Sequence, residues 1–244
     1  MKKIVVCSAV AIASVSFAQM YHPMTERILK ITGGRLEKPG TQKGEIVYVN
    51  CQESAKKEWI LEGIDHMVQM THIKLSLREG RFEFPPPDPV GNLCIYIVDN
   101  PKYPMTLIAP EARWALVNVC PLKADKEAFF KARVLKQMSR TFAALCGAGK
   151  SAGSGTLTDP ITKAEDLDTH TKDTLPLDVL VRLPNYLAPL GVTPAQVFTY
   201  INACKQGWAP QPTNDVQKAI WDKVHAIPSK PIKIEYNEKR DKGK

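Results

Sequence analysis

The sequence predicts an α+β protein in which a mixed sheet is combined with two long helices and a C-terminal helical part. Three observations lead to this fold class. Short runs rich in β-branched residues recur between residues 44 and 122, two longer segments carry apolar residues at helical spacing, and residues 151–227 show helix start and stop signals. The expected order is strand, helix, several strands and helix, followed by further helices.

The first eighteen residues are typical of a secretory signal. Lys2 and Lys3 precede an apolar run, and Ser16 and Ala18 place small residues at the two positions that a signal peptidase requires before its cleavage site. We therefore expect an exported chain, periplasmic or extracellular, after removal of residues 1–18. No later apolar run approaches the roughly 18 residues that cross a bilayer, so no transmembrane segment is expected.

The charge of the chain comes partly from its two ends. The 244 residues carry a formal net charge of +8, and residues 228–244 form a basic tail. This tail contains one aromatic residue, Tyr236, and no recognised nucleic-acid motif. A solvated tail is the favoured interpretation, and no nucleic-acid partner is expected. Residues 19–43 form an N-terminal lead-in that a glycine pair, Gly33 and Gly34, interrupts.

The core domain is expected over residues 44–150. It starts with a strand at residues 44–51, and a helix follows at residues 54–71 with one apolar stripe. Strands are expected at residues 73–77, 92–99 and 113–122, with a short edge segment at residues 105–109. A second long helix runs from about Asp125 to a stop at Gly147. Its apolar stripe consists of Phe130, Val134, Met138, Phe142 and Leu145.

Residues 151–227 are interpreted as a helical continuation of the same domain. One helix ends at Pro184, and a second begins at Pro194 with Thr193 as its N-cap. A last helix is expected from about Asn214 to His225.

The order of the core elements, with a long helix that ends at Gly147, resembles the metzincin zinc metalloproteases, including the archaemetzincin branch. The resemblance implies an active-site helix that bears the motif HExxHxxGxxH, whose three histidines bind zinc and whose glutamate activates the metal-bound water. Aligned on Gly147, the histidine positions fall on Arg140, Ala144 and Lys150, and the glutamate position falls on Thr141.

None of these four residues can perform the chemistry of the motif. Arginine and lysine present a cation to a cation, and alanine has no donor atom. We therefore expect no zinc, no other cofactor and no catalytic residue on this helix. The resemblance then implies a secreted, non-catalytic protein on a degenerate metzincin-like scaffold, which binds a peptide or a glycan in the former cleft.

Two other functions remain open. Asp166, Asp168 and His170 alternate along a segment that is interpreted as an extended loop, where two carboxylates and an imidazole could hold a divalent cation. An enzyme of another class could use this loop or an isolated cysteine, such as Cys94 or Cys120. A solvated acidic loop is the simpler alternative. The chain could also be a structural component of the cell envelope.

The C-terminal part contains two further candidates. Trp208 and Trp221 could form an aromatic ledge for a sugar or a peptide, although packing within the protein explains them equally well. Cys146 and Cys204 both lie near helix ends beside glycine-bearing turns, and we predict a disulfide bond between them. Two reduced, buried thiols are the alternative.

Overall fold

The computed structural model describes residues 23–86, 92–147, 151, 153, 156–169 and 174–226. The chain divides into two compact units. We call Pro39–Gln196 the sheet unit, and the flanking parts, up to Lys38 and from Val197, the terminal unit. The expected signal segment and basic tail lie outside the described residues, so their prediction is not tested.

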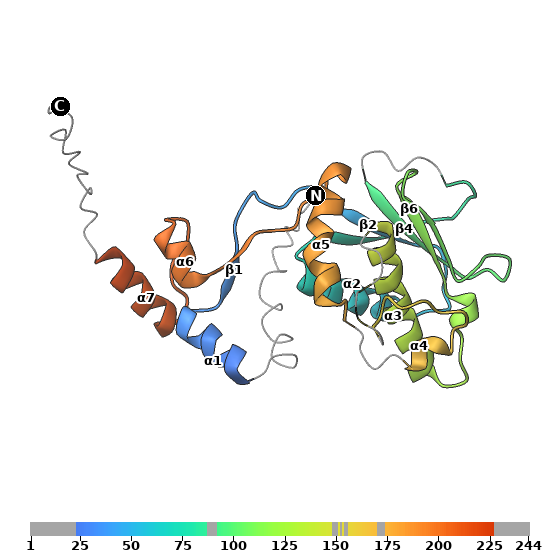
Figure 1. Ribbon diagram of the computed structural model, residues 1–244, viewed down its shortest axis with the longest axis horizontal. Coiled ribbons are helices and arrows are strands. Elements are labelled where there is room, and N and C mark those ends of the chain that lie inside the picture. Colours follow the sequence, from blue (N-terminus) through green and yellow to red (C-terminus); the bar gives the residue numbers. More distant parts are fainter. Residues whose placement is uncertain are drawn as a thin grey trace, which may run out of the picture. The chain divides into compact units, whose positions relative to one another are not determined.

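Figure 1 shows the elements in chain order. The strands are β1 (Arg35–Glu37), β2 (Ile46–Asn50), β3 (Leu75–Glu79), β4 (Leu93–Val98), β5 (Thr106–Ala109), β6 (Trp114–Asn118) and β7 (Val197–Thr199). The helices are α1 (Pro23–Thr32), α2 (Lys57–Thr71), α3 (Glu127–Leu145), α4 (Asp166–Thr169), α5 (Leu177–Leu187), α6 (Tyr200–Lys205) and α7 (Asp215–His225). Short 3-10 turns lie at Cys120–Leu122 and Ala188–Leu190. None of the described helices is long and apolar enough to cross a membrane.

The sheet unit is built on a mixed sheet with the strand order β3-β2-β4-β6-β5. Strands β2, β3, β4 and β6 run parallel, and β5 pairs with β6 in the antiparallel direction at one edge. All six residues of β4 are buried, as expected for a central strand with both faces covered. The five predicted strand segments are therefore confirmed.

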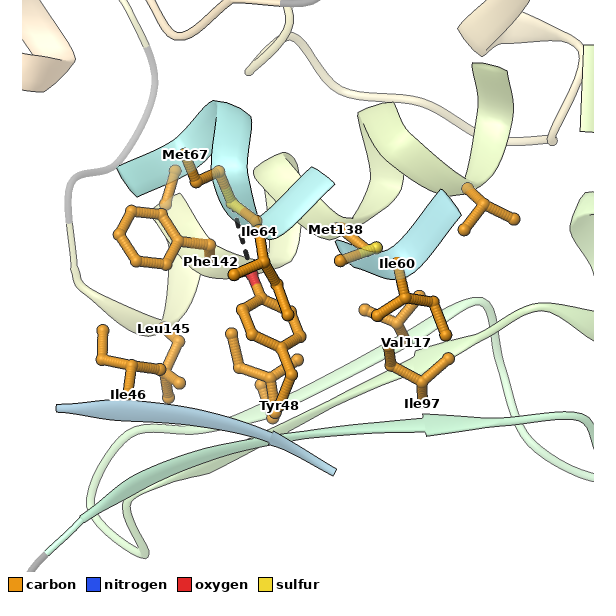
Figure 2. Close-up of a cluster of buried hydrophobic side chains, with 14 of the residues drawn as sticks. Ile46, Tyr48, Ile60, Ile64, Met67, Ile97, Val117, Met138, Phe142 and Leu145 are labelled. Atoms are coloured by element: carbon orange, nitrogen blue, oxygen red, sulfur yellow. Dashed lines mark hydrogen bonds between the residues drawn. The ribbon is translucent and has the colours of Figure 1, made fainter. Parts of the chain in front are cut away.

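One face of the sheet packs against α2 and α3, which lie on the same side (Figure 2). Tyr48 from β2 is fully buried there, and its hydroxyl group donates a hydrogen bond of 3.3 Å to the sulfur atom of Met67 on α2. Phe142 and Met138 of α3 have no exposed surface, so the apolar stripe predicted for this helix is its core face. The other face of the sheet holds a smaller cluster around Tyr96 and Trp114, which Phe82 covers.

The terminal unit joins the two ends of the described chain. Strand β1 pairs with β7 in the antiparallel direction, and α1 packs against α7. Gly33 has a φ of +75°, and a Cβ atom added there would lie 2.9 Å from Ile220 and 3.1 Å from Tyr200. The predicted glycine break is thus a tight turn that only glycine fits.

Two predictions for the C-terminal part are wrong. The helix expected from Pro194 begins only at Tyr200, because the preceding residues form β7 and pair with β1. The helix expected to end at Pro184 continues to Leu187, because Leu183 and Leu187 extend its buried stripe into the core. The last helix, α7, is confirmed, with Asn214 as its N-cap.

Candidate functional site

A hollow of about 400 Å³ lies where α3 passes the edge strand β5. Four residues of α3 line it at spacings of three and four, which places them on one face of the helix. Two alternate residues of β5 form one wall and two residues that precede α4 form another. The lining residues are Gln137, Arg140, Thr141 and Ala144 from α3, Thr106 and Ile108 from β5, Pro104 and Met105 before β5, and Ile161 and Thr162.

Strand β5 is the last strand of this sheet in the described part of the chain. The backbone N–H of Asn118 donates to the backbone carbonyl of Met105 at 3.0 Å, so Met105 and Asn118 face each other as a hydrogen-bonded pair. With the register of β5 and β6, this bond shows which residues of β5 direct their backbone groups toward β6. Because bonded and non-bonded positions alternate, the N–H and C=O groups of Thr106 and Ile108 point away from β6. The same two residues line the hollow. The hollow therefore lies beside backbone groups that no strand in the described residues uses.

Arg140 brings a half-buried positive charge to the hollow. One terminal nitrogen, Nη1, donates to the carbonyl oxygen of Leu157, and Nε is buried without a hydrogen-bond partner among the described residues. Burial lowers the pKa of this guanidinium, and the negative charge of Asp159 opposes that effect. Arginine keeps its charge at neutral pH in either case.

Gln137 lies one turn before Thr141 on the same face and is only 3% exposed. Its side-chain nitrogen, Nε2, donates to the hydroxyl groups of Thr106 and, at 3.3 Å, of Thr141. Its oxygen, Oε1, is buried and has no partner among the described residues. A buried amide oxygen without a donor costs about 1–3 kcal/mol.

The structure brings three of the four motif positions together. Arg140, Thr141 and Ala144 line the same hollow, and Lys150 lies outside the described residues. Gly147 ends α3 as predicted, with a φ of +69°. Sequence reasoning missed Gln137 and the edge strand wall. The available signal was that Gln137 shares the helix face of the motif positions, three and four residues away.

The interpretation of Asp166, Asp168 and His170 as an extended loop is wrong for the part that is described. Residues Asp166–Thr169 form the helical turn α4, so the two carboxylates do not alternate along a strand. Asp166 accepts hydrogen bonds from the backbone of Thr162 and Lys163. Asp168 forms an ion pair with Arg133, and His170 lies outside the described residues. Both carboxylates thus have partners within the protein.

The two tryptophans each pack on an aromatic neighbour in the terminal unit. The ring of Trp208 meets Phe198 edge to face with centroids 5.6 Å apart, and its Nε1 donates to Gln206. Trp221 stacks on His225 at 4.1 Å. Both rings are partly exposed. These contacts give each tryptophan a packing role, and the use of either one as a ligand ledge remains a prediction.

The disulfide prediction finds no support. All five cysteines of the described residues are free thiols, including Cys146 and Cys204. Cys146 is 1% exposed in the core of the sheet unit, and Cys204 belongs to the terminal unit, where it is 4% exposed. Burial raises the pKa of each thiol. Both cysteines therefore behave as small apolar side chains.

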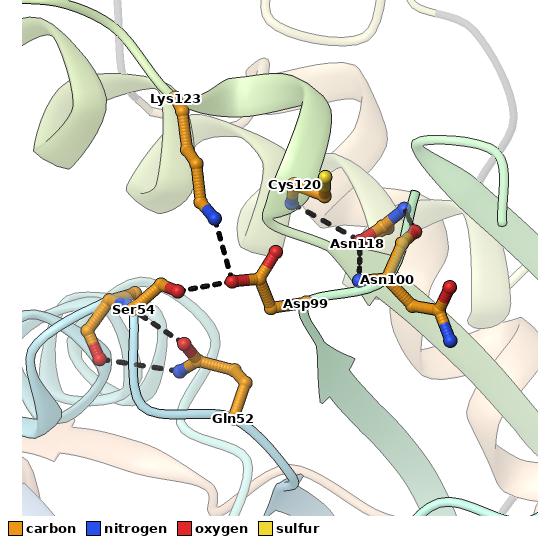
Figure 3. Close-up of polar contacts among 8 residues, drawn as sticks. Gln52, Ser54, Asp99, Asn100, Asn118, Cys120 and Lys123 are labelled. Atoms are coloured by element: carbon orange, nitrogen blue, oxygen red, sulfur yellow. Dashed lines mark hydrogen bonds and ion pairs between the residues drawn. The ribbon is translucent and has the colours of Figure 1, made fainter. Parts of the chain in front are cut away.

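A second polar cluster lies at the carboxyl ends of β4 and β6 (Figure 3). Asp99 accepts hydrogen bonds from Ser54 and, at 2.8 Å, from Lys123. Burial alone would raise the pKa of Asp99, but the hydrogen bonds from Lys123 and Ser54 outweigh it and lower that pKa. This carboxylate is ionised and already paired at neutral pH, so it is a weak candidate for a general base.

Asn118 in the same region is fully buried, and its side chain forms hydrogen bonds with the loop after β4. Its side-chain nitrogen donates to the carbonyl groups of Asn100 and Tyr103 at 2.7 and 2.8 Å. Its oxygen accepts from the backbone of Asn100 and Cys120, both at 3.1 Å. All hydrogen-bonding groups of this amide are in use, so we assign the cluster a structural role.

The comparisons with known proteins concern the fold. No protein-family model matches the sequence, and no curated protein sequence matches it. Among solved structures, archaemetzincin from Methanopyrus kandleri matches 63% of this chain and 99% of its own length, with 11% identity and a TM-score of 0.50. A zinc-dependent peptidase from Methanocorpusculum labreanum matches 57% of this chain and 100% of its own, with 13% identity and a TM-score of 0.44.

This chain has an α+β fold similar to that of archaemetzincin. The predicted fold class is therefore confirmed. The zinc that the fold family implies does not fit the described residues of the hollow, which offer a guanidinium, hydroxyl groups, an amide, a thioether and apolar side chains, and no histidine, thiolate or carboxylate. Among the described residues, no three histidine, cysteine, aspartate or glutamate side chains lie together as metal ligands.

Proposed function

We propose that this chain is a non-catalytic peptide-binding protein, which holds an extended segment of a partner chain against β5. One observation carries the proposal. The helix face with Arg140, Thr141 and Ala144 and the open edge of β5 line the same hollow. The similarity of the fold to that of archaemetzincin agrees with the metzincin-like scaffold of this proposal.

The chemistry of the hollow supports binding without cleavage. Peptide hydrolysis by a metzincin-type site needs zinc ligands and a base that activates water. Arg140 and Ala144 supply neither a lone pair for zinc nor a base, and the hydroxyl of Thr141 accepts a hydrogen bond from Gln137. We therefore propose that the cleft keeps its shape for an extended chain and lacks the hydrolytic step.

A peptide fits the site better than a glycan. The N–H and C=O groups of Thr106 and Ile108 face the open edge, and their spacing matches the backbone of an added strand. Ile108 is 41% exposed, so its apolar side chain is also available. A sugar would use neither the regular backbone spacing nor this apolar wall.

Export is part of the same proposal. The lysine pair and the apolar run within residues 1–18 support a secretory signal, which would place the binding site in the periplasm or outside the cell. Sequencing of the N-terminus of the protein isolated from whole cells tests this part of the proposal, because it shows whether the chain still begins at Met1. A mature chain that starts at Gln19 is expected, and an uncleaved chain in the cytoplasm would contradict export.

Substitution of Ile108 by proline tests strand addition. Proline removes the N–H of residue 108, which points away from β6, so the ladder within the sheet stays intact. The probe is a fluorescein-labelled short peptide of alternating valine and threonine with one central glutamate, and binding is read by fluorescence anisotropy. We expect Ile108→Pro to weaken binding about tenfold, because a peptide hydrogen bond is lost and its carbonyl partner stays unsatisfied.

The matched control is Ile108→Thr, which shortens the same side chain and keeps the N–H group. It should bind the probe more tightly than Ile108→Pro, and both variants should melt within a few degrees of the parent. Absence of binding by the parent, or equal binding by Ile108→Pro and Ile108→Thr, would refute strand addition at β5. Cleavage of the probe with about one zinc bound per chain would refute the non-catalytic assignment.

A further inference from the structure

We infer that the segment bound along β5 carries aromatic side chains at the alternate positions that face away from α3, and that the exposed ring of Phe84 receives them. This inference rests on the proposed peptide-binding function and names the class of peptide. In an added strand, successive side chains point to opposite faces of the sheet, so the bound segment meets two surfaces. The hollow beside α3 is the first surface, and an aromatic cluster on the opposite face of the sheet is the second.

Strand β5 connects this second surface with the open edge of the sheet. Leu107 and Ala109 alternate with the two β5 residues that line the hollow, so they point to the opposite face. Both residues pack against the buried cluster on that face. In the register of the hairpin, Ala109 lies opposite Trp114 of β6, which belongs to the same cluster. The cluster therefore extends to the strand beside which the peptide is added.

Phe84 forms the outer part of this cluster. It is 60% exposed, and its ring centroid lies 6.3 Å from that of Tyr103 and 6.2 Å from that of Trp114. Tyr103 precedes β5, whereas Trp114 pairs with Ala109 at the other end of that strand. Because the ring of Phe84 contacts both, it lies along β5 on the face away from α3. We call Phe84, Tyr103 and Trp114 the aromatic platform.

The aromatic platform is held in place by contacts within the protein. The ring centroid of Phe82 lies 6.5 Å from that of Phe84 and 5.5 Å from that of Tyr103. Trp114 is only 8% exposed, so the platform presents one open ring on a buried aromatic base. A ring that is fixed in this way leaves apolar surface in water. Contact with a partner removes that surface from water and orders few additional side chains.

Aromatic side chains fit the platform better than aliphatic ones. The rings of Phe84 and Trp114 meet edge to face, with an angle of 87° between their planes. A further ring beside Phe84 continues this arrangement, and aromatic pairs stabilise a contact beyond the area that they bury. On the opposite face, the hollow includes the hydroxyl groups of Thr106 and Thr162, which suit small polar side chains. The expected segment therefore alternates aromatic and small polar residues.

Three fluorescein-labelled peptides with lysine at both ends test this class. The first alternates threonine and tyrosine, the second alternates threonine and alanine, and the third has the composition of the first with its tyrosines in adjacent pairs. Anisotropy titrations with the parent should show that the alternating tyrosine peptide binds about tenfold more tightly than the alanine peptide, because its rings pack on the platform. Adjacent tyrosines point to both faces of the sheet, so the third peptide should bind more weakly than the first.

Phe84→Ser removes the exposed ring, and it should bind the alternating tyrosine peptide no more tightly than the parent binds the alanine peptide. Phe129→Ser is the matched control, because Phe129 is 47% exposed and lines a different hollow, beside Arg133 and Asp168. It should keep the parental preference. Circular dichroism melts verify that both variants fold. If Phe84→Ser does not fold, Phe84→Leu keeps an apolar side chain without the ring and should reduce the preference about threefold.

The outcomes separate the two proposals. Equal binding of the alternating tyrosine peptide and either of the other two by the parent overturns the aromatic class and leaves the peptide-binding function in place. An unchanged preference in the folded Phe84 variant overturns the role of Phe84.

The variant Ile108→Pro tests the two proposals against each other. If it binds the tyrosine peptide as the parent does while Phe84→Ser does not, strand addition is overturned and the platform stands as an aromatic-binding surface. Elution of the parent as a dimer that Phe84→Ser converts to a monomer would assign the platform to a second copy of the chain and overturn the peptide class. Binding of none of the peptides overturns both proposals.

Discussion

Replacement of Asp168 by alanine is expected to destabilise the sheet unit by about 2–3 kcal/mol. The side chain of Arg133 is 7% exposed, and Asp168 satisfies it with Nε–Oδ1 and Nη2–Oδ2 distances of 3.0 and 2.6 Å. Removal of one partner from a fully buried pair costs about 3–5 kcal/mol, because the other charge stays buried. The expected value lies below this range because Asp168 is 24% exposed and water can replace part of the carboxylate.

The assay is urea unfolding followed by tryptophan fluorescence, in a double-mutant cycle with Arg133→Met. In the Arg133→Met background no buried cation remains, so Asp168→Ala should then cost less than about 1 kcal/mol. Equal costs of Asp168→Ala in the two backgrounds would show that the ion pair contributes nothing specific.

The pH dependence of the same variant gives a second check. The hydrogen bonds and charge of Arg133 lower the pKa of Asp168 in the folded state. A lowered folded pKa means that the stabilisation is fully present above the unfolded pKa of about 3.9, and that it is lost as the pH falls through the folded value. The difference in stability between the parent and Asp168→Ala should therefore shrink as the pH is lowered from about 7 to about 3.

Three further predictions concern the core and the thiols. Phe142→Ala should lower the free energy of unfolding by about 3–5 kcal/mol in the same urea assay, because the ring is fully buried, and parental stability would show that the ring does not fill the core. Burial, assisted by Glu79, raises the pKa of Cys51 from 9.0 to about 11, so its alkylation by iodoacetamide at pH 7 should be about a hundredfold slower than that of an exposed thiol and should accelerate toward pH 11. Cys146 should react only after unfolding, and a Cys146–Cys204 link in a non-reduced peptide map would contradict the free thiols of the structure.

The sequence by itself determined the layout of the sheet unit. Runs such as residues 93–98 are apolar throughout, and a strand buried on both faces is what that pattern requires. The stripe that contains Met138 and Phe142 fixed the core face of α3, and Gly147 fixed its end. These features follow from local periodicity and from the conformational freedom of glycine, so they do not depend on distant contacts.

Segments whose hydrogen bonds go to distant partners could not be predicted in this way. Residues 194–199 carry helix start signals, yet Val197–Thr199 pair with β1, more than a hundred residues earlier in the chain. Asp168 lies in an acidic stretch that is typical of a solvated loop, but it forms an ion pair with Arg133 on α3. Local patterns do not record such long-range partners.

The candidate site likewise has features that local sequence determines and features that depend on tertiary packing. The sequence alone placed Arg140, Thr141 and Ala144 on one helix face and excluded them as zinc ligands, because side-chain chemistry and helical spacing are local properties. Only the tertiary structure decided that this face meets the open edge of β5, and that Gln137 and Arg140 each keep a buried polar atom without a partner among the described residues. The physical reason is that a hollow is the space left between packed elements, and its shape depends on how the whole unit packs.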